Sequence, residues 1–266
     1  MTFHYAAFRA LKKESGAVGA FVELTELAIR EFKSRHQTSG IDFDMYIRTA
    51  STRNGMHLHY KEWPSTLARI ARSYIMQTNE SLERFLAEYA HEYETFFRAN
   101  WRSKRQDESR LDYVLDCAGQ RALRASFQYD LISYYVDVRH ATVHPPGGNQ
   151  LRALQRKWVG LAEHFDEIRE WFPSAGLPNA FEEIKFGDHK LFHRAVQEFA
   201  ADLSERSRPP DAVLGEIAVQ ATAYGRHSKE RAIGKAAKYL QTRFGLELDA
   251  SMAIARYHLS GPLAQR

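Results

Sequence analysis

The sequence predicts an all-α protein, and three observations support this fold class. Hydrophobic residues make up 44% of the 266 positions, which is enough for a packed core. Only 15 glycines and 8 prolines interrupt the chain. Apolar side chains recur at intervals of three and four residues over most of its length, as on one face of an α-helix. We therefore expect a helical bundle, with a different pattern only near residues 41–62.

The first helical patterns lie before residue 40. Residues 2–13 form a short amphipathic segment, and the pair Ser15-Gly16 is expected to separate it from a longer helix. That helix should stop at residues 38–40, where the sequence reads Thr-Ser-Gly.

Residues 41–62 have the least helical pattern. Apolar and polar side chains alternate on both sides of Asn54-Gly55, a strong turn dipeptide. A small hairpin and a long ordered loop are both compatible with this pattern. The triplet Trp63-Pro64-Ser65 is typical of a helix start. The helix should reach Trp101, with a break or a second cap at residues 78–81.

The strongest helical pattern covers residues 125–142, after a shorter helix expected at 111–118. Its apolar stripe follows the spacing i, i+3, i+4 and i+7 with Leu131, Tyr134, Tyr135 and Val138, and Thr142 extends it at i+11. Pro145 and Pro146 should end it. Another helical pattern covers residues 151–172, and residues 173–179 resemble a linker. Shorter helices are expected at 190–205, 211–224, 228–244 and 249–258. We expect two domains, residues 1–172 and 173–266.

Composition excludes several classes of protein. The single cysteine, Cys117, cannot form an internal disulfide or a zinc site built on several thiolates. No run approaches about 18 apolar residues, so we expect no membrane span. Lys12 and Lys13 follow the first aromatic residues, the reverse of a secretory signal. We expect a cytoplasmic protein, whose net charge of +4 is compatible with an anionic partner.

The end of the 125–142 helix carries the residues best suited to chemistry. Arg139 and His144 are five positions apart, or about 140° around a straight helix. Pro145 disfavours the α conformation at His144, so the histidine is expected to swing back over the helix end toward Arg139. An imidazole can move a proton near neutral pH, and a guanidinium matches phosphate oxygens. The pair therefore suits cleavage of RNA by its own 2′-hydroxyl, without a metal.

At these residues the chain resembles the HEPN superfamily of helical proteins. Its signature is an arginine followed roughly four to six residues later by a histidine at a helix end, commonly with Asn, Asp or His after the arginine. Here that residue is His140. The resemblance covers residues 111–172, while residues 17–101 are compatible helices. It implies metal-independent endoribonuclease activity, in which Arg139, His144 and His140 are the site residues.

The same resemblance implies dimers whose two Arg–His pairs meet in one cleft. It also implies a role as a toxin or abortive-infection effector in bacterial antiviral defence, with an antitoxin as a possible partner. In one subgroup a tyrosine two residues after the histidine is modified by the antitoxin. Pro146 stands there in this chain, so that form of control is not expected.

The alternative is a non-catalytic helical module that binds a protein, RNA or a nucleotide. An arginine and a histidine near a helix end can cap carbonyl groups, or pair with acids such as Asp137. The pairs His57/His59 and His189/His193 have spacings seen at metal sites, but Lys190 replaces the glutamate of a HExxH motif. We expect neither a metal nor an organic cofactor.

A second RNA-binding surface is expected in residues 226–243. This stretch has a single acid, Glu230, with aromatic residues interleaved, so it can hold an RNA backbone. An ordinary solvated helix face is the other reading. Its basic residues are Arg226, Lys229, Arg231, Lys235, Lys238 and Arg243.

Overall fold

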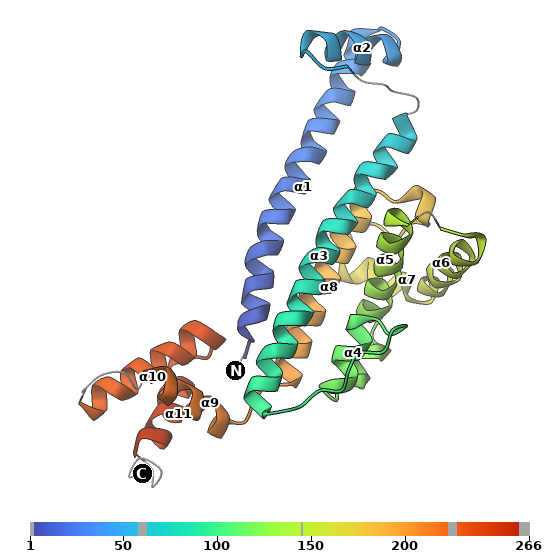
Figure 1. The fold of residues 1–266 in the computed structure, drawn as a ribbon. Helices are drawn as coiled ribbons and strands as arrows, with labels where there is room; N and C mark the ends of the chain where they lie inside the picture. Colours follow the sequence, from blue (N-terminus) through green and yellow to red (C-terminus); the bar gives the residue numbers. More distant parts are fainter. Residues whose placement is uncertain (1–2, 58–62, 145, 223–227, 261–266) are drawn as a thin grey trace. The chain divides into compact units, whose positions relative to one another are not determined.

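The computed structural model describes residues 3–57, 63–144, 146–222 and 228–260 (Figure 1). Within these ranges the regular structure is helical throughout and no strand occurs, which confirms the predicted all-α class. None of the helices in these ranges is long and apolar enough to cross a bilayer.

Contacts divide the chain into two compact units. Unit 1 comprises residues 1–13, 80–130 and 194–266, and unit 2 comprises residues 14–79 and 131–193. Four helices contribute residues to both units: α1 (Ala6–Ser39), α3 (Trp63–Phe97), α5 (Phe127–Val143) and α8 (Phe186–Arg206). The expected division at residue 172 concerns independently folding domains, and it stays a prediction.

Unit 2 is built around the start of α8, which packs against both α3 and α5. The rings of Tyr135 on α5 and Phe192 on α8 lie 5.2 Å apart, and Tyr74 on α3 contacts His189 on α8 edge to face. All four side chains are buried. The smaller elements of this unit are α2 (Phe43–Arg53), α6 (Gly148–Gly160), α7 (Phe165–Trp171) and the 3-10 turns η2 (Leu161–His164) and η3 (Phe181–Glu183).

Unit 1 joins the chain start to α3 and to the C-terminal part. The hydroxyl of Tyr5 donates to the Ser207 carbonyl oxygen at 2.7 Å, and the Tyr89 hydroxyl donates to the Ser207 hydroxyl at 2.8 Å. Three C-terminal helices pack on one another in this unit. They are α9 (Asp211–Thr222), α10 (Lys229–Phe244) and α11 (Leu248–Ser260), and the unit also contains α4 (Arg110–Cys117) and the 3-10 turn η1 (Arg121–Ala125).

The small hairpin and the long ordered loop, the two alternatives for this segment, are both wrong for residues 43–53. Helix α2 occupies Phe43–Arg53 instead, and Asp42 caps it by accepting from the backbone N–H groups of Asp44 and Met45. Asn54 ends this helix as its C-cap, with Gly55 following at a φ of +66°. The Asn-Gly dipeptide is therefore a helix stop rather than a hairpin turn.

The breaks expected at residues 15–16 and 78–81 are also wrong, because α1 and α3 run through them. One glycine inside a helix costs only about 1 kcal/mol, which packing along a long helix offsets. Thr78 and Asn79 are buried, and the Thr78 hydroxyl lies 3.2 Å from His189 Nδ1. Short polar residues that look like breakers here are internal packing residues. The helix expected over residues 151–172 is divided into α6, the 3-10 turn η2 and α7. The other expected helices are present with ends shifted by a few residues.

Candidate functional site

The candidate site lies at the end of α5, whose preceding turns are fixed in the core of unit 2. Four residues of the predicted stripe are fully buried: Leu131, Tyr134, Tyr135 and Val138 are each 0% exposed, whereas Thr142 is half-buried. As expected, the helix ends at Val143, immediately before His144. Arg139 is half-buried, whereas His140 and His144 are exposed. The structure thus places two imidazoles and one guanidinium within reach of solvent at one helix end.

The backbone at His144 stays close to the helix. Its N–H donates to the His140 carbonyl oxygen at 2.9 Å, which closes the last turn of α5, although the helix itself ends at Val143. On helix geometry Arg139 and His144 are about 140° apart around the axis. His140 and His144, four residues apart, are only about 40° apart. No hydrogen bond joins the side chains of Arg139 and His144, both of which lie in the described part of the chain, so the expected approach of the histidine to the arginine is not seen.

Asp137, the acid expected to pair with Arg139 or His144, has a different partner. Lys157 Nζ on α6 lies 2.6 Å from an Asp137 carboxylate oxygen and donates to the Ser133 hydroxyl at 2.9 Å. The structure gives Arg139, His140 and His144 no ion pair within residues 3–57, 63–144, 146–222 and 228–260. The carboxylate that would make this arginine purely structural is thus engaged by a lysine.

Two tyrosine hydroxyls hold the middle of α5. Tyr134 donates to the Asn179 carbonyl oxygen at 2.6 Å, and Tyr135 donates to Asp188 Oδ1 at 2.9 Å. Asp188 is fully buried and also accepts from the Asn179 N–H and side-chain amide and from the Lys185 N–H. Burial raises the pKa of Asp188, and these donors offset part of that rise. The segment expected to be a linker is thereby tied into unit 2.

Sequence reasoning missed Asp188, although one local signal was present. Asp188 is the third residue of α8 and accepts from the N–H of the residue before the helix, Lys185, at 2.8 Å. That contact is the carboxylate half of a capping box. The Tyr135 contact, across 53 positions, has no local signature.

The histidine pairs weighed as metal sites are explained differently. His189 is 3% exposed, and burial, followed by the neighbouring His193, lowers its pKa to about 4. It is a neutral core residue. His57 is exposed, and His59 lies outside the described residues. The described ranges contain no group of three possible metal ligands among His, Cys, Asp and Glu.

The second expected RNA surface lies on α10 in unit 1. Lys229, Arg231, Lys235 and Lys238 are exposed, and Arg226 lies outside the described residues. Arg243 has a partner within the protein: its guanidinium lies 3.2 Å from Glu92, which also accepts from the Ala6 N–H at 2.9 Å. Arg243 thus contributes to the packing of unit 1.

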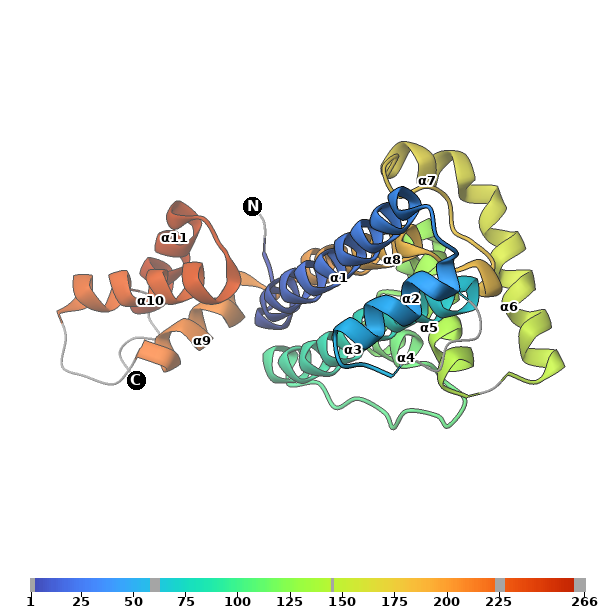
Figure 2. The same ribbon diagram turned by 90° about the horizontal axis from the view of Figure 1, so that it is seen from above.

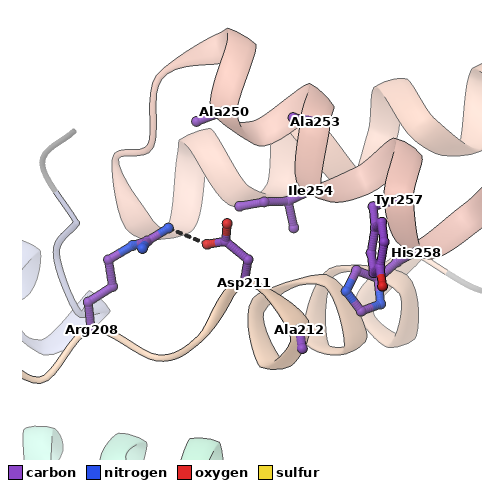
Figure 3. A pocket seen from close by; sticks show the side chains of 8 residues that line it. All are labelled: Arg208, Asp211, Ala212, Ala250, Ala253, Ile254, Tyr257 and His258. Carbon is purple, nitrogen blue, oxygen red and sulfur yellow. Dashed lines mark hydrogen bonds and ion pairs between the residues drawn. The ribbon is translucent and has the colours of Figure 1, made fainter.

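Unit 1 also has a hollow of about 450 Å³ beside α9 and α11 (Figure 3). Its size falls in the range of small-molecule sites, and alanines and Ile254 form much of its wall. Arg208 and Asp211 form an ion pair at one end, while Tyr257 and His258 lie together at the other. Because the ion pair neutralises both charges, the hollow shows no preference for an anion such as RNA phosphate.

Comparison with known proteins adds no relative: no family model, curated protein or solved structure matches this chain.

Proposed function

We propose that the chain is a metal-independent endoribonuclease of the HEPN type whose site is the end of α5. One observation carries the proposal. Arg139, His140 and His144 lie within six residues at the end of a buried helix, and Asp137 is engaged by Lys157 instead. Arginines that are fully buried in proteins are almost always paired, and Arg139 is half-buried with no acid partner in the described ranges. An arginine without such a partner beside two exposed imidazoles suits an anionic substrate.

The chemistry assigned to each residue follows from its groups. An imidazole, that of His144, takes the proton of the RNA 2′-hydroxyl as the oxygen attacks phosphorus. The Arg139 guanidinium stabilises the charge that develops on the phosphate oxygens. A second imidazole gives a proton to the leaving 5′-oxygen. The products are a 2′,3′-cyclic phosphate and a 5′-hydroxyl end.

We also propose that the active form is a homodimer. Within one chain the two imidazoles point to nearly the same side, whereas Arg139 points about 140° away from His144. A two-fold axis near α5 brings the arginine of one chain to the histidines of the other, and two-fold dimers are the commonest assembly. A role in antiviral defence, with an antitoxin as partner, rests on the HEPN resemblance alone.

The test is cleavage of structured and unstructured RNA in EDTA, with chemical analysis of the ends. We expect cyclic phosphate ends from the wild type and none from His144→Ala. The matched control is His57→Ala, an exposed histidine of the same unit that should leave cleavage unchanged. Equal cleavage by His144→Ala would remove this histidine from the mechanism, and Arg139→Lys should be severe because a point charge cannot replace a fork.

A second candidate function is RNA binding without cleavage. The separation of Arg139 from His144 within one chain, about 140° around the helix axis, is compatible with it if no second chain completes the site. RNA that is bound but recovered intact would support it.

A further inference from the structure

An acid-free stretch surrounds the end of α5. Residues 138–162 contain no aspartate or glutamate, although 33 acids among 266 residues would give about three in a stretch of this length. The stretch contains four basic residues: Arg139, Arg152, Arg156 and Lys157. It covers the last part of α5 and all of α6.

Two of these arginines stand on the solvent face of α6. Arg152 and Arg156 are exposed and four residues apart, so they share one side of the helix about 6 Å apart along its axis. Leu154, on the opposite side, is 2% exposed and faces the core. Val159, 55% exposed, shares the outer face with the arginines. Two guanidinium forks and one apolar side chain thus share a solvent face, and positive charge that follows the backbone is one of the two features of surfaces that bind single strands.

Several other arginines on helix surfaces have a carboxylate partner one turn away on the same helix. They are Arg30 with Glu26 and Arg194 with Glu198, both at 2.9 Å, and Arg35 with Glu31 at 3.8 Å. The described structure gives Arg152 and Arg156 no carboxylate partner; Arg152 contacts the Asn149 side chain. Their charge is left for an external anion.

Helix α6 lies next to the candidate site. It begins at Gly148, four residues after His144. Helices α5 and α6 are neighbours in both views (Figures 1 and 2). The Lys157–Asp137 ion pair of 2.6 Å fixes α6 against α5 two residues before Arg139. A strand that crosses the end of α5 therefore meets α6.

We propose that Arg152 and Arg156 bind the phosphate backbone of single-stranded RNA and hold it across the end of α5. Arginine is suited to this task because its planar fork contacts phosphate oxygens and also stacks on bases. Val143 and Leu151, which are 40% and 38% exposed, offer apolar contacts to the bound RNA. Cleavage of the bound strand rests on the proposed function, whereas binding does not.

The experiment measures binding apart from cleavage. Fluorescence anisotropy of a labelled oligouridine RNA is followed with the full chain carrying His144→Ala, at about 50 mM and about 200 mM salt. Adding Arg152→Gln and Arg156→Gln should weaken binding at least about tenfold at the lower salt. It should also flatten the slope of log affinity against log salt by about 1.4, since each phosphate contact to a single strand contributes about 0.7.

Two controls sharpen the result. The pair Arg30→Gln and Arg35→Gln removes two exposed but acid-paired arginines of the same unit and should change the slope little. The pair Lys235→Gln and Lys238→Gln tests α10 directly. Thermal unfolding of each variant shows whether it remains folded.

The outcomes separate this inference from the proposed function. Undiminished RNA binding by the Arg152/Arg156 variant, or no binding by its parent, overturns the α6 surface even if the wild type cleaves RNA. A loss confined to the α10 variant does the same. If the Arg152/Arg156 variant loses RNA binding while the wild type leaves RNA intact, the result supports the α6 surface and contradicts the proposed nuclease activity.

Discussion

Replacing Tyr135 with phenylalanine should destabilise the protein more than the same change at its neighbour Tyr134. Both side chains are 0% exposed and each loses one hydroxyl that donates a hydrogen bond. The Tyr135 bond ends on the buried Asp188 carboxylate, whereas the Tyr134 bond ends on a neutral carbonyl. A hydrogen bond to a charged group contributes about 1.5–3 kcal/mol and a neutral one about 0.5–1.5. We expect about 2 kcal/mol for Tyr135→Phe and about 1 kcal/mol for Tyr134→Phe.

Urea titrations followed by circular dichroism give the two free energies of unfolding, and the difference between them is the quantity of interest. Three donors remain on Asp188 after Tyr135→Phe, so the carboxylate is not left alone. A double-mutant cycle of Tyr135→Phe with Asp188→Asn should show a coupling of about 1 kcal/mol. If Tyr134→Phe costs as much as Tyr135→Phe, or if the coupling vanishes, Asp188 does not anchor α5 as argued.

Three further results are expected. The pKa of His189 in the folded protein is about 4, below the ordinary 6.5. The free energy of unfolding should therefore be up to about 3 kcal/mol higher above pH 6.5 than at pH 4, because the unfolded chain binds a proton first as the pH falls. His189→Gln should flatten the dependence of stability on pH in this window, and an unchanged pH profile would contradict this. Gly215→Ala should destabilise unit 1 by about 1–3 kcal/mol, because the new Cβ would lie 1.9 Å from an imidazole of α11. Gly234→Ala places its Cβ in open space and should stabilise α10 by up to about 1 kcal/mol. Thermal melting temperatures that shift alike in the two variants would refute this. Mixing the inactive chains Arg139→Ala and His144→Ala should restore part of the RNA cleavage after subunit exchange, and no restoration would exclude a site shared between two chains.

The sequence predicted where helices exist better than where they end. The spacing of apolar residues identified the helix of residues 125–142, because side chains on the buried face of a helix recur every three or four positions. The breaks were mispredicted because Ser15 and Asn79 are buried, where packing and hydrogen bonds satisfy polar groups that would stop an isolated helix. The short alternation after residue 41 was outweighed by the cap that Asp42 provides to α2.

The candidate site divides in the same way into local and long-range features. The place of Arg139 and His144 at a helix end follows from the proline that comes next, a local rule. The partners that decide what these residues can do come from elsewhere in the chain. Lys157 reaches Asp137 from α6, and Asp188 holds Tyr135 from 53 positions away. The sequence indicated Asp137 as a possible ion-pair partner of Arg139, but no local pattern shows that Lys157 pairs with it instead.

The geometry of one helix end also decides how many chains the proposed reaction needs. His140 and His144 are four residues apart at the last turn, so in the proposed reaction a single chain would supply both the base and the acid there. Arg139 stands about 140° around the helix axis from His144. The hydrogen bonds of Tyr134 and Tyr135 hold α5 against rotation about its own axis. Charge developing on a phosphate between the imidazoles therefore needs a guanidinium from outside this turn. Arg139 of a second copy fits a two-fold arrangement, which is why activity recovered from two individually inactive chains bears on the mechanism more directly than any single substitution.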